Sequence, residues 1–121
     1  SGIVGDKGLV VTEPARHYAA FASFDPVFDP KDKDVVVQYE VRLQEGLECG
    51  GAYLKLASHS SGFKAKDFNN DTPYAIMFGP DKCGGTNKVH FIFRHQNPLT
   101  KQWEEKHLKN PPSIKMDKLT H

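Results

Sequence analysis

The stretch Val35–Leu43, with the sequence VVVQYEVRL, decides the fold class because its apolar and polar side chains alternate. Its odd positions are all apolar or aromatic, and its even positions from 38 onward are glutamine, glutamate and arginine. Side chains of a β-strand point alternately to opposite faces, so this period of two predicts a half-buried strand. Similar patterns predict strands near residues 17–24, 52–56, 74–78 and 88–94 and, more weakly, at 102–107.

Glycine, proline and small polar residues separate these segments and predict turns. We expect a connector at 24–31, a polar surface loop at 58–71, a hairpin tip at 97–100, and tight turns at Glu45-Gly46, Cys49-Gly50-Gly51, Gly79-Pro80-Asp81 and Cys83-Gly84-Gly85. No long segment carries the apolar stripe of an amphipathic helix. Short strands with turns between them predict an all-β antiparallel β-sandwich.

Length and charge restrict the class of protein further. The 121 residues suit one domain or part of one. The 16 basic and 15 acidic residues alternate along the chain and leave a net charge of +1, which argues against a nucleic-acid partner. No apolar run approaches the roughly 18–20 residues of a membrane span. The first residues lack the features of a signal peptide, which fits either a cytosolic protein or one whose signal has been removed.

The chain has two cysteines, Cys49 and Cys83. An even count permits a disulfide but does not require one, and two buried free thiols are an equal alternative from spacing alone. A bond between them would close a loop of about 35 residues, which the chain-entropy model associates with about 3.5–4 kcal/mol of stabilisation. A zinc site is disfavoured, because neither cysteine has a second cysteine or a histidine at ligand spacing.

The two cysteine segments, Arg42–Leu56 and Ile76–Gly84, closely resemble the two signature motifs of the calreticulin and calnexin family of endoplasmic-reticulum lectin chaperones. The flanking residues 72–74 and 88–95, and residues 6–10 near the start, are similar to the same family. The resemblance implies a legume-lectin-like (concanavalin-type) antiparallel β-sandwich or jelly roll. It also implies a disulfide between Cys49 and Cys83 beside a sugar site, and a non-enzymatic protein of the endoplasmic reticulum lumen. Such a protein binds monoglucosylated high-mannose N-glycans on newly made, unfolded glycoproteins.

The family's sugar contacts correspond to Tyr53, Lys55, Tyr74, Met77 and Asp81 in this chain. Positions 53 and 55 share parity with Cys49, so their side chains project from one face of a strand. A tyrosine supplies an aromatic plane and a hydroxyl, a lysine donates and an aspartate accepts, which together suit the C–H faces and hydroxyls of a hexose. Met77 has the opposite parity to Tyr74, so a bulge or a bend is needed to bring the two together.

The resemblance also implies a structural calcium ion remote from the sugar, with N-terminal ligands around Gly5, Asp6 and Lys7. Lys7 could contribute only its carbonyl oxygen, because an ammonium group cannot ligate Ca²⁺. Calcium takes six to eight oxygens, so we expect an incomplete site in this chain. The alternative is an exposed turn, which the glycines on either side would form unaided.

We expect residues 1–121 to be the central part of one lectin-like globular domain, incomplete at both ends. The resemblance places elsewhere the proline-rich arm that recruits a disulfide isomerase, the acidic tail, and any membrane anchor. The sequon Asn70-Asp71-Thr72 precedes Pro73, which disfavours glycosylation. The aspartates at 25, 29, 32 and 34 read as a solvated connector, since prolines and lysines interrupt them.

Two alternative functions remain open from the residues alone. One is a glycan-independent module that binds unfolded polypeptide. The other is a glycoside hydrolase on the same sandwich, which would require two carboxylates about 5–10 Å apart. The only adjacent acids in a predicted strand are Glu104 and Glu105, and strand neighbours face opposite ways.

Overall fold

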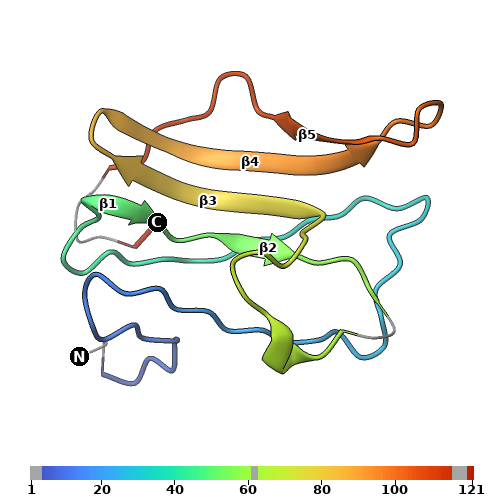
Figure 1. Cartoon of the computed structure of the whole chain (residues 1–121). Helices are drawn as coiled ribbons and strands as arrows, with labels where there is room; N and C mark the ends of the chain where they lie inside the picture. The colour runs from blue at the N-terminus through green and yellow to red at the C-terminus, as the bar shows by residue number, and fades with distance from the viewer. Residues whose placement is uncertain (1–3, 61–62, 116–119) are drawn as a thin grey trace.

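The computed structural model describes residues 4–60, 63–115 and 120–121 and shows an antiparallel sheet of five strands (Figure 1). The elements are β1 (Cys49–Gly51), β2 (Leu54–Leu56), the short 3-10 helix η1 (Ala65–Asp67), β3 (Ile76–Cys83), β4 (Thr86–Gln96) and β5 (Trp103–His107). The strand order is β1-β3-β4-β5, and β2 also pairs with β3. In this part of the chain, no helix is long and apolar enough to cross a membrane.

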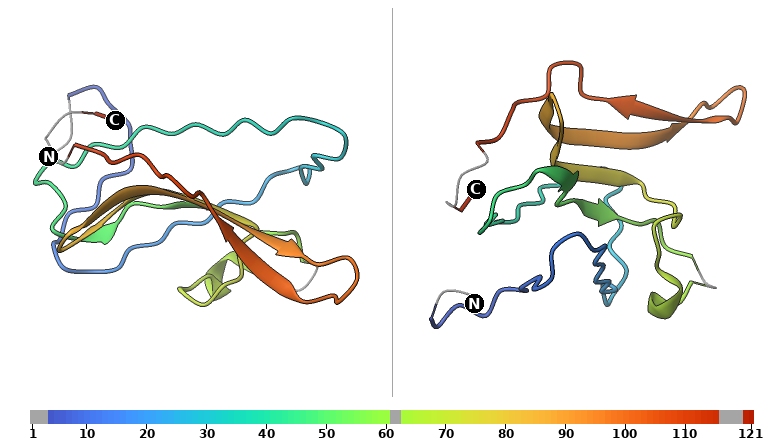
Figure 2. Two further views of the ribbon diagram at one scale, coloured as in Figure 1. Left: turned by 90° about the horizontal axis from the view of Figure 1, so that it is seen from above. Right: turned by 60° about the vertical axis from the view of Figure 1, so that its left-hand side comes forward.

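β3 is the central strand, because β1 and β2 lie end to end along one of its edges and β4 lies along the other. Gly51 of β1 pairs with Asp81 of β3, and Leu54 of β2 pairs with Phe78 of β3. The two short strands therefore share one continuous register on β3. The sheet is strongly twisted when seen from above (Figure 2). This arrangement lets residues 49–56 and 76–83 share one face over their whole length.

Two hairpins follow the predicted turns. Gly84 and Gly85 connect β3 to β4, and Gly84 adopts a φ of 55°, which glycine tolerates best. The hairpin tip at residues 97–100 connects β4 to β5, and the side-chain oxygen of Asn97 accepts hydrogen bonds from the backbone N–H groups of Leu99 and Thr100. The predicted turn at Glu45-Gly46 is also present, since Gly46 N–H donates to the carbonyl of Leu43 (3.0 Å).

Two predicted turns are wrong, because both lie inside strands. Cys49-Gly50-Gly51 is β1, and Gly79-Pro80-Asp81 is the middle of β3. Glycine and proline normally interrupt a strand. Here Gly79 takes a φ of 139° and Pro80 is buried between β4 and the β1–β2 edge, so the strand continues through a locally distorted backbone.

The segments 17–24 and 35–43 were expected as strands, but neither pairs as a strand among the described residues. The extended segment 35–43 makes one isolated bridge, between Arg42 and Thr120. It runs along one face of the sheet (Figure 2), where the Tyr39 ring packs edge-on against Phe78 with centroids 5.3 Å apart. The alternation of this segment therefore reflects packing against the sheet. Over most of its length, the segment has no paired strand among the described residues.

The apolar interior is small. Leu43 and Ile92 are the buried hydrophobic side chains of the described residues, and Ile92 is only 4% exposed. The face that carries Leu54, Phe78 and Phe91 packs on segment 35–43, whereas the opposite face carries Met77 paired with Ile92. This second face presents most of the polar side chains of interest.

Candidate carbohydrate-binding site

The register of the sheet brings four of the predicted contact residues onto one face. Lys55 lies directly opposite Met77, and Gly51 lies opposite Asp81. Directly paired residues of an antiparallel ladder project from the same face, and residues two apart on a strand do so as well. Tyr53 lies between Gly51 and Lys55, so its side chain shares this face.

Glycine makes room for Tyr53 on this face. A Cβ atom built on Gly51 would overlap the Tyr53 ring at Cζ and the hydroxyl oxygen. The Tyr53 side chain therefore folds back over the Gly51 backbone toward the end of the sheet that carries Asp81. A side chain at position 51 would push the ring out of this place.

Asp81 accepts from two groups on the face. His90 Nε2 lies 2.7 Å from Asp81 Oδ2, and both side chains are largely shielded, at 16% and 24% exposed. The Tyr53 and His90 rings lie edge to face with centroids 6.0 Å apart. Burial, followed by the hydrogen bond and the charge of Asp81, raises the pKa of Tyr53 to about 12. The Tyr53 phenol therefore stays protonated at neutral pH and can donate.

A second group of side chains surrounds Tyr74. Lys55 Nζ lies 5.5 Å from the centre of the Tyr74 ring, which is a cation–π distance. The Tyr74 hydroxyl donates to Glu105 Oε1 (2.7 Å). Burial and then this hydrogen bond raise the pKa of Tyr74 to about 12, and the same hydrogen bond holds the pKa of Glu105 below its usual value. Arg94 of β4, which pairs with Glu105 of β5, also lowers the pKa of Glu105, by a smaller amount.

A bend at Ala75 explains how Tyr74 reaches the face that carries Met77 despite their opposite parity. The register pairs Leu56 with Ile76, yet the Leu56 carbonyl accepts from Ala75 N–H (2.7 Å), so the ladder slips by one residue where β3 begins. Lys55 contacts the Tyr74 ring and pairs with Met77. The expected bend therefore lies just before β3.

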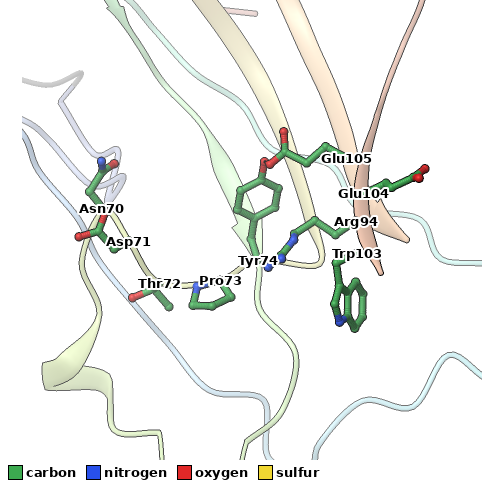
Figure 3. Close-up of a pocket in the computed structure, with 9 residues that line it drawn as sticks. All are labelled: Asn70, Asp71, Thr72, Pro73, Tyr74, Arg94, Trp103, Glu104 and Glu105. Carbon is green, nitrogen blue, oxygen red and sulfur yellow. The ribbon is translucent and has the colours of Figure 1, made fainter. Parts of the chain in front are cut away.

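Beside Tyr74 the surface forms an open hollow of about 370 Å³, with the Tyr74 hydroxyl directed to Glu105 (Figure 3). Arg94 Cζ lies 5.5 Å from the Trp103 ring centre, and Trp103 is 58% exposed. The lining comes from the loop before β3 and from β4 and β5: Asn70, Asp71, Thr72, Pro73, Tyr74, Arg94, Trp103, Glu104 and Glu105. The hollow thus offers an aromatic surface together with hydrogen-bonding groups.

Sequence reasoning missed His90, Arg94, Trp103 and Glu105 as members of this face. The alternation along 102–107 indicated that Glu105 and Trp103 share a face, but it could not say which face of the sheet this is. That assignment requires the register of β5 on β4, where Glu105 pairs with Arg94.

The cysteines form the disulfide that the resemblance implied. Cys49 and Cys83 are direct partners in the β1–β3 register, with Cα atoms 4.0 Å apart, and a bond joins their sulfur atoms. The next pair on the same face is Gly51 with Asp81. The disulfide therefore braces the end of the sheet where Tyr53 and Asp81 lie.

The predicted calcium ligands lie in an exposed turn. Asp6 Oδ1 accepts a hydrogen bond from Gly8 N–H (2.9 Å), and both Asp6 and Lys7 are exposed. In the ranges 4–60, 63–115 and 120–121, no group of three or more histidine, cysteine or acidic side chains could hold a metal ion. A calcium role for Asp6 and the Lys7 carbonyl stays a prediction, as does glycosylation of Asn70.

The all-β architecture with its antiparallel sheet defines the class, a legume-lectin-like β-sandwich protein. The chain belongs to the calreticulin family, whose family model matches residues 1–121. It is 58% identical over 120 residues to a calnexin homolog of Aspergillus fumigatus and 59% identical over 117 residues to one of Pisum sativum. These alignments cover 99% and 96% of this chain but only 21% of each relative, so the chain spans about a fifth of their length.

A solved structure is also similar. The globular domain of T. cruzi calreticulin matches with a TM-score of 0.54 and 36% sequence identity. The match covers 67% of this chain and 28% of that chain. The predicted fold class is therefore confirmed, and so is the resemblance to the family.

Proposed function

We propose that this chain carries the carbohydrate-binding surface of a lectin chaperone that binds monoglucosylated N-linked glycans on newly made glycoproteins. Membership of the calreticulin family supports the general class of chaperone. We further propose that the protein works in the endoplasmic reticulum lumen, where such glycans meet folding polypeptides. The proposed partners are monoglucosylated glycans and unfolded glycoproteins, with a disulfide isomerase recruited by an arm outside this chain.

The observation that carries the proposal is the gathering of Tyr53, Lys55, Tyr74, Met77 and Asp81 on one face of the sheet, with Tyr74 lining the hollow at one end of that face. Lys55 donates, while the carboxylates and the two phenol oxygens, whose own protons bond Asp81 and Glu105, accept, so the face can satisfy hydroxyls of either polarity. The aromatic rings and Met77 offer apolar surface to the C–H face of a hexose.

The face is also held in place before a ligand arrives. The disulfide fixes β1 on β3, and Gly51 leaves room for the Tyr53 ring. Hydrogen bonds hold Asp81 on His90 and Tyr74 on Glu105. Groups that are already ordered lose little conformational entropy on binding, which favours affinity for a small polar ligand.

Asp81 and Glu105 lie too far apart on this face to serve as the carboxylate pair of the alternative function, a glycoside hydrolase. Asp81 pairs with Lys88, and Glu105 pairs with Arg94, six residues further along β4. At about 3.4 Å per residue the two backbone positions are about 20 Å apart along the strand, whereas glycosidic cleavage needs carboxylates about 5–10 Å apart.

We also propose a structural calcium ion, to which Asp6 and the Lys7 carbonyl would contribute. Both residues are exposed, and Asp6 already bends the chain toward Gly8. Carboxylate and carbonyl oxygens are the ligands that Ca²⁺ prefers. Two oxygens fall short of the usual six to eight, so the remainder would come from outside the described residues.

Calorimetry with a glucose-α1,3-mannose oligosaccharide tests the lectin function. We expect binding by the protein at its natural length, and at least a tenfold loss in Lys55→Ala, because a charge-assisted donor is worth about 1.5–3 kcal/mol. Lys33→Ala, on the exposed connector, is the matched control and should bind as the wild type does. Absence of binding by the folded, oxidised protein would overturn the proposal, and release of free sugar would favour the hydrolase.

A further inference from the structure

Pro80 leaves a gap in the hydrogen-bonding ladder beside the candidate site. Ala52 N–H donates to the Pro80 carbonyl (3.1 Å), as expected for a hydrogen-bonded pair of an antiparallel ladder. In such a pair, the carbonyl oxygen of each residue accepts a hydrogen bond from the N–H of the other residue. Pro80 has no N–H, so the Ala52 carbonyl lacks its ladder donor.

The hydroxyl of Tyr39 fills this gap. It donates to the Ala52 carbonyl oxygen at 2.7 Å, in a partly buried position. Tyr39 reaches it from the face opposite the candidate site, where its ring packs on Phe78. Burial raises the pKa of Tyr39, so the phenol stays protonated and keeps its role as donor.

The chain is built closely around this hydrogen bond. A Cβ atom on Gly79 would overlap both the Ala52 carbonyl oxygen and the Tyr39 hydroxyl oxygen. Gly79 also has a φ of 139°, a conformation that other residues rarely adopt. Ala52 directly precedes Tyr53 and joins β1 to β2, so the place of its carbonyl fixes the backbone from which the Tyr53 ring projects.

We propose that Tyr39 is a positioning residue of the candidate site, since its hydroxyl replaces the missing Pro80 N–H and holds the Ala52–Tyr53 peptide in place. The inference rests on the proposed function for its effect on glycan affinity. The replacement of the missing Pro80 N–H by the Tyr39 hydroxyl concerns backbone hydrogen bonding alone, so it can be tested without any glycan.

The test is Tyr39→Phe in the protein at its natural length. We expect the Kd for the glucose-α1,3-mannose oligosaccharide to rise about fivefold, the equivalent of one ordinary hydrogen bond. We also expect faster hydrogen exchange at the Ala52 amide, which faces Pro80. Tyr18→Phe is the matched control, because the Tyr18 hydroxyl accepts a hydrogen bond from the exposed Glu13 N–H (3.2 Å). This variant should change neither quantity.

The decisive variant is Tyr39→Phe/Pro80→Ala, which returns an N–H to position 80 opposite the Ala52 carbonyl. We expect it to recover most of the affinity and of the amide protection that Tyr39→Phe loses, or to recover folding if Tyr39→Phe does not fold. If Tyr39 served only in packing, an N–H restored at position 80 would not recover what Tyr39→Phe loses. The inference fails if the double variant is no better than Tyr39→Phe, or if Tyr39→Phe leaves the Ala52 amide unchanged. Failure of the wild type to bind glycan would instead refute the proposed function, and the exchange data would still decide the role of Tyr39.

Discussion

The two ends of the candidate binding face are held by different kinds of interaction. At one end, the disulfide end, a covalent bond and backbone geometry hold the contacts: Cys49, Gly51, Tyr53, Gly79, Asp81 and Cys83. At the other, the hollow end, half-buried and exposed side chains hold one another by a hydrogen bond and two cation–π contacts: Lys55, Tyr74, Arg94, Trp103 and Glu105. Solvent and salt screen interactions of the second kind, so rigidity should fall from the first end to the second.

Removing the disulfide should produce the largest effect on stability. In Cys49→Ser/Cys83→Ser we expect the free energy of unfolding to fall by about 4 kcal/mol, because the bond joins residues 34 apart and its loss frees the unfolded chain. Urea denaturation followed by circular dichroism measures the change. The wild type in reducing agent should behave like the variant, and an unchanged midpoint in both would show that the disulfide end does not depend on its covalent bond.

The backbone of the disulfide end should be nearly as sensitive. Gly79→Ala should cost about 3 kcal/mol, since the new methyl group meets the Ala52 carbonyl at a φ that alanine rarely adopts. Gly85→Ala is the matched control, because a Cβ there meets nothing within 4 Å. Equal midpoints for the two variants in the same urea titration would contradict the close packing around Gly79.

The hollow end should respond least in stability, but visibly in its titration. The hydrogen bond from Tyr74 lowers the folded-state pKa of Glu105, so its small stabilisation is present above the unfolded-state pKa and is lost as the pH falls through the folded-state pKa. Tyr74→Phe should raise the pKa of Glu105 toward its ordinary value and cost less than about 1 kcal/mol, given the exposure of the pair.

Carboxyl chemical shifts followed by NMR across the acid range measure the titration of Glu105. Tyr53→Phe, which acts on Asp81 at the other end, should leave that titration unchanged. If Tyr53→Phe moved the pKa of Glu105 as far as Tyr74→Phe does, the two ends would be coupled and could not be treated as independent supports.

Local sequence patterns predicted the elements that depend on neighbours along the chain. The hairpin at Asn97 and the turn at Gly84 follow from residues that bond within a few positions. β4 extends beyond its predicted limits at both ends, while its alternation correctly placed the 88–94 core. The family motifs supplied the cysteine pairing, which spacing alone left open.

Local sequence patterns could not predict the contacts between residues on different strands. Gly79-Pro80 reads as a turn because nothing nearby in sequence reveals that a hydroxyl 41 positions earlier replaces the proline's missing donor. Glu105 meets Tyr74 across 31 positions, through the registers of three strands. The alternation of 35–43 predicted a strand, but alternation describes burial on one face and does not supply a ladder partner.

The disulfide between Cys49 and Cys83 turns this part of the chain into a closed ring of covalent bonds. All five proposed sugar contacts lie within that ring, while His90 and Glu105 lie outside it and join only through the sheet. The exposed loop before β3 is part of the same ring. A protease that cut the loop once would open the ring without releasing either piece, and the two halves of the face would remain tied together at Cys49 and Cys83.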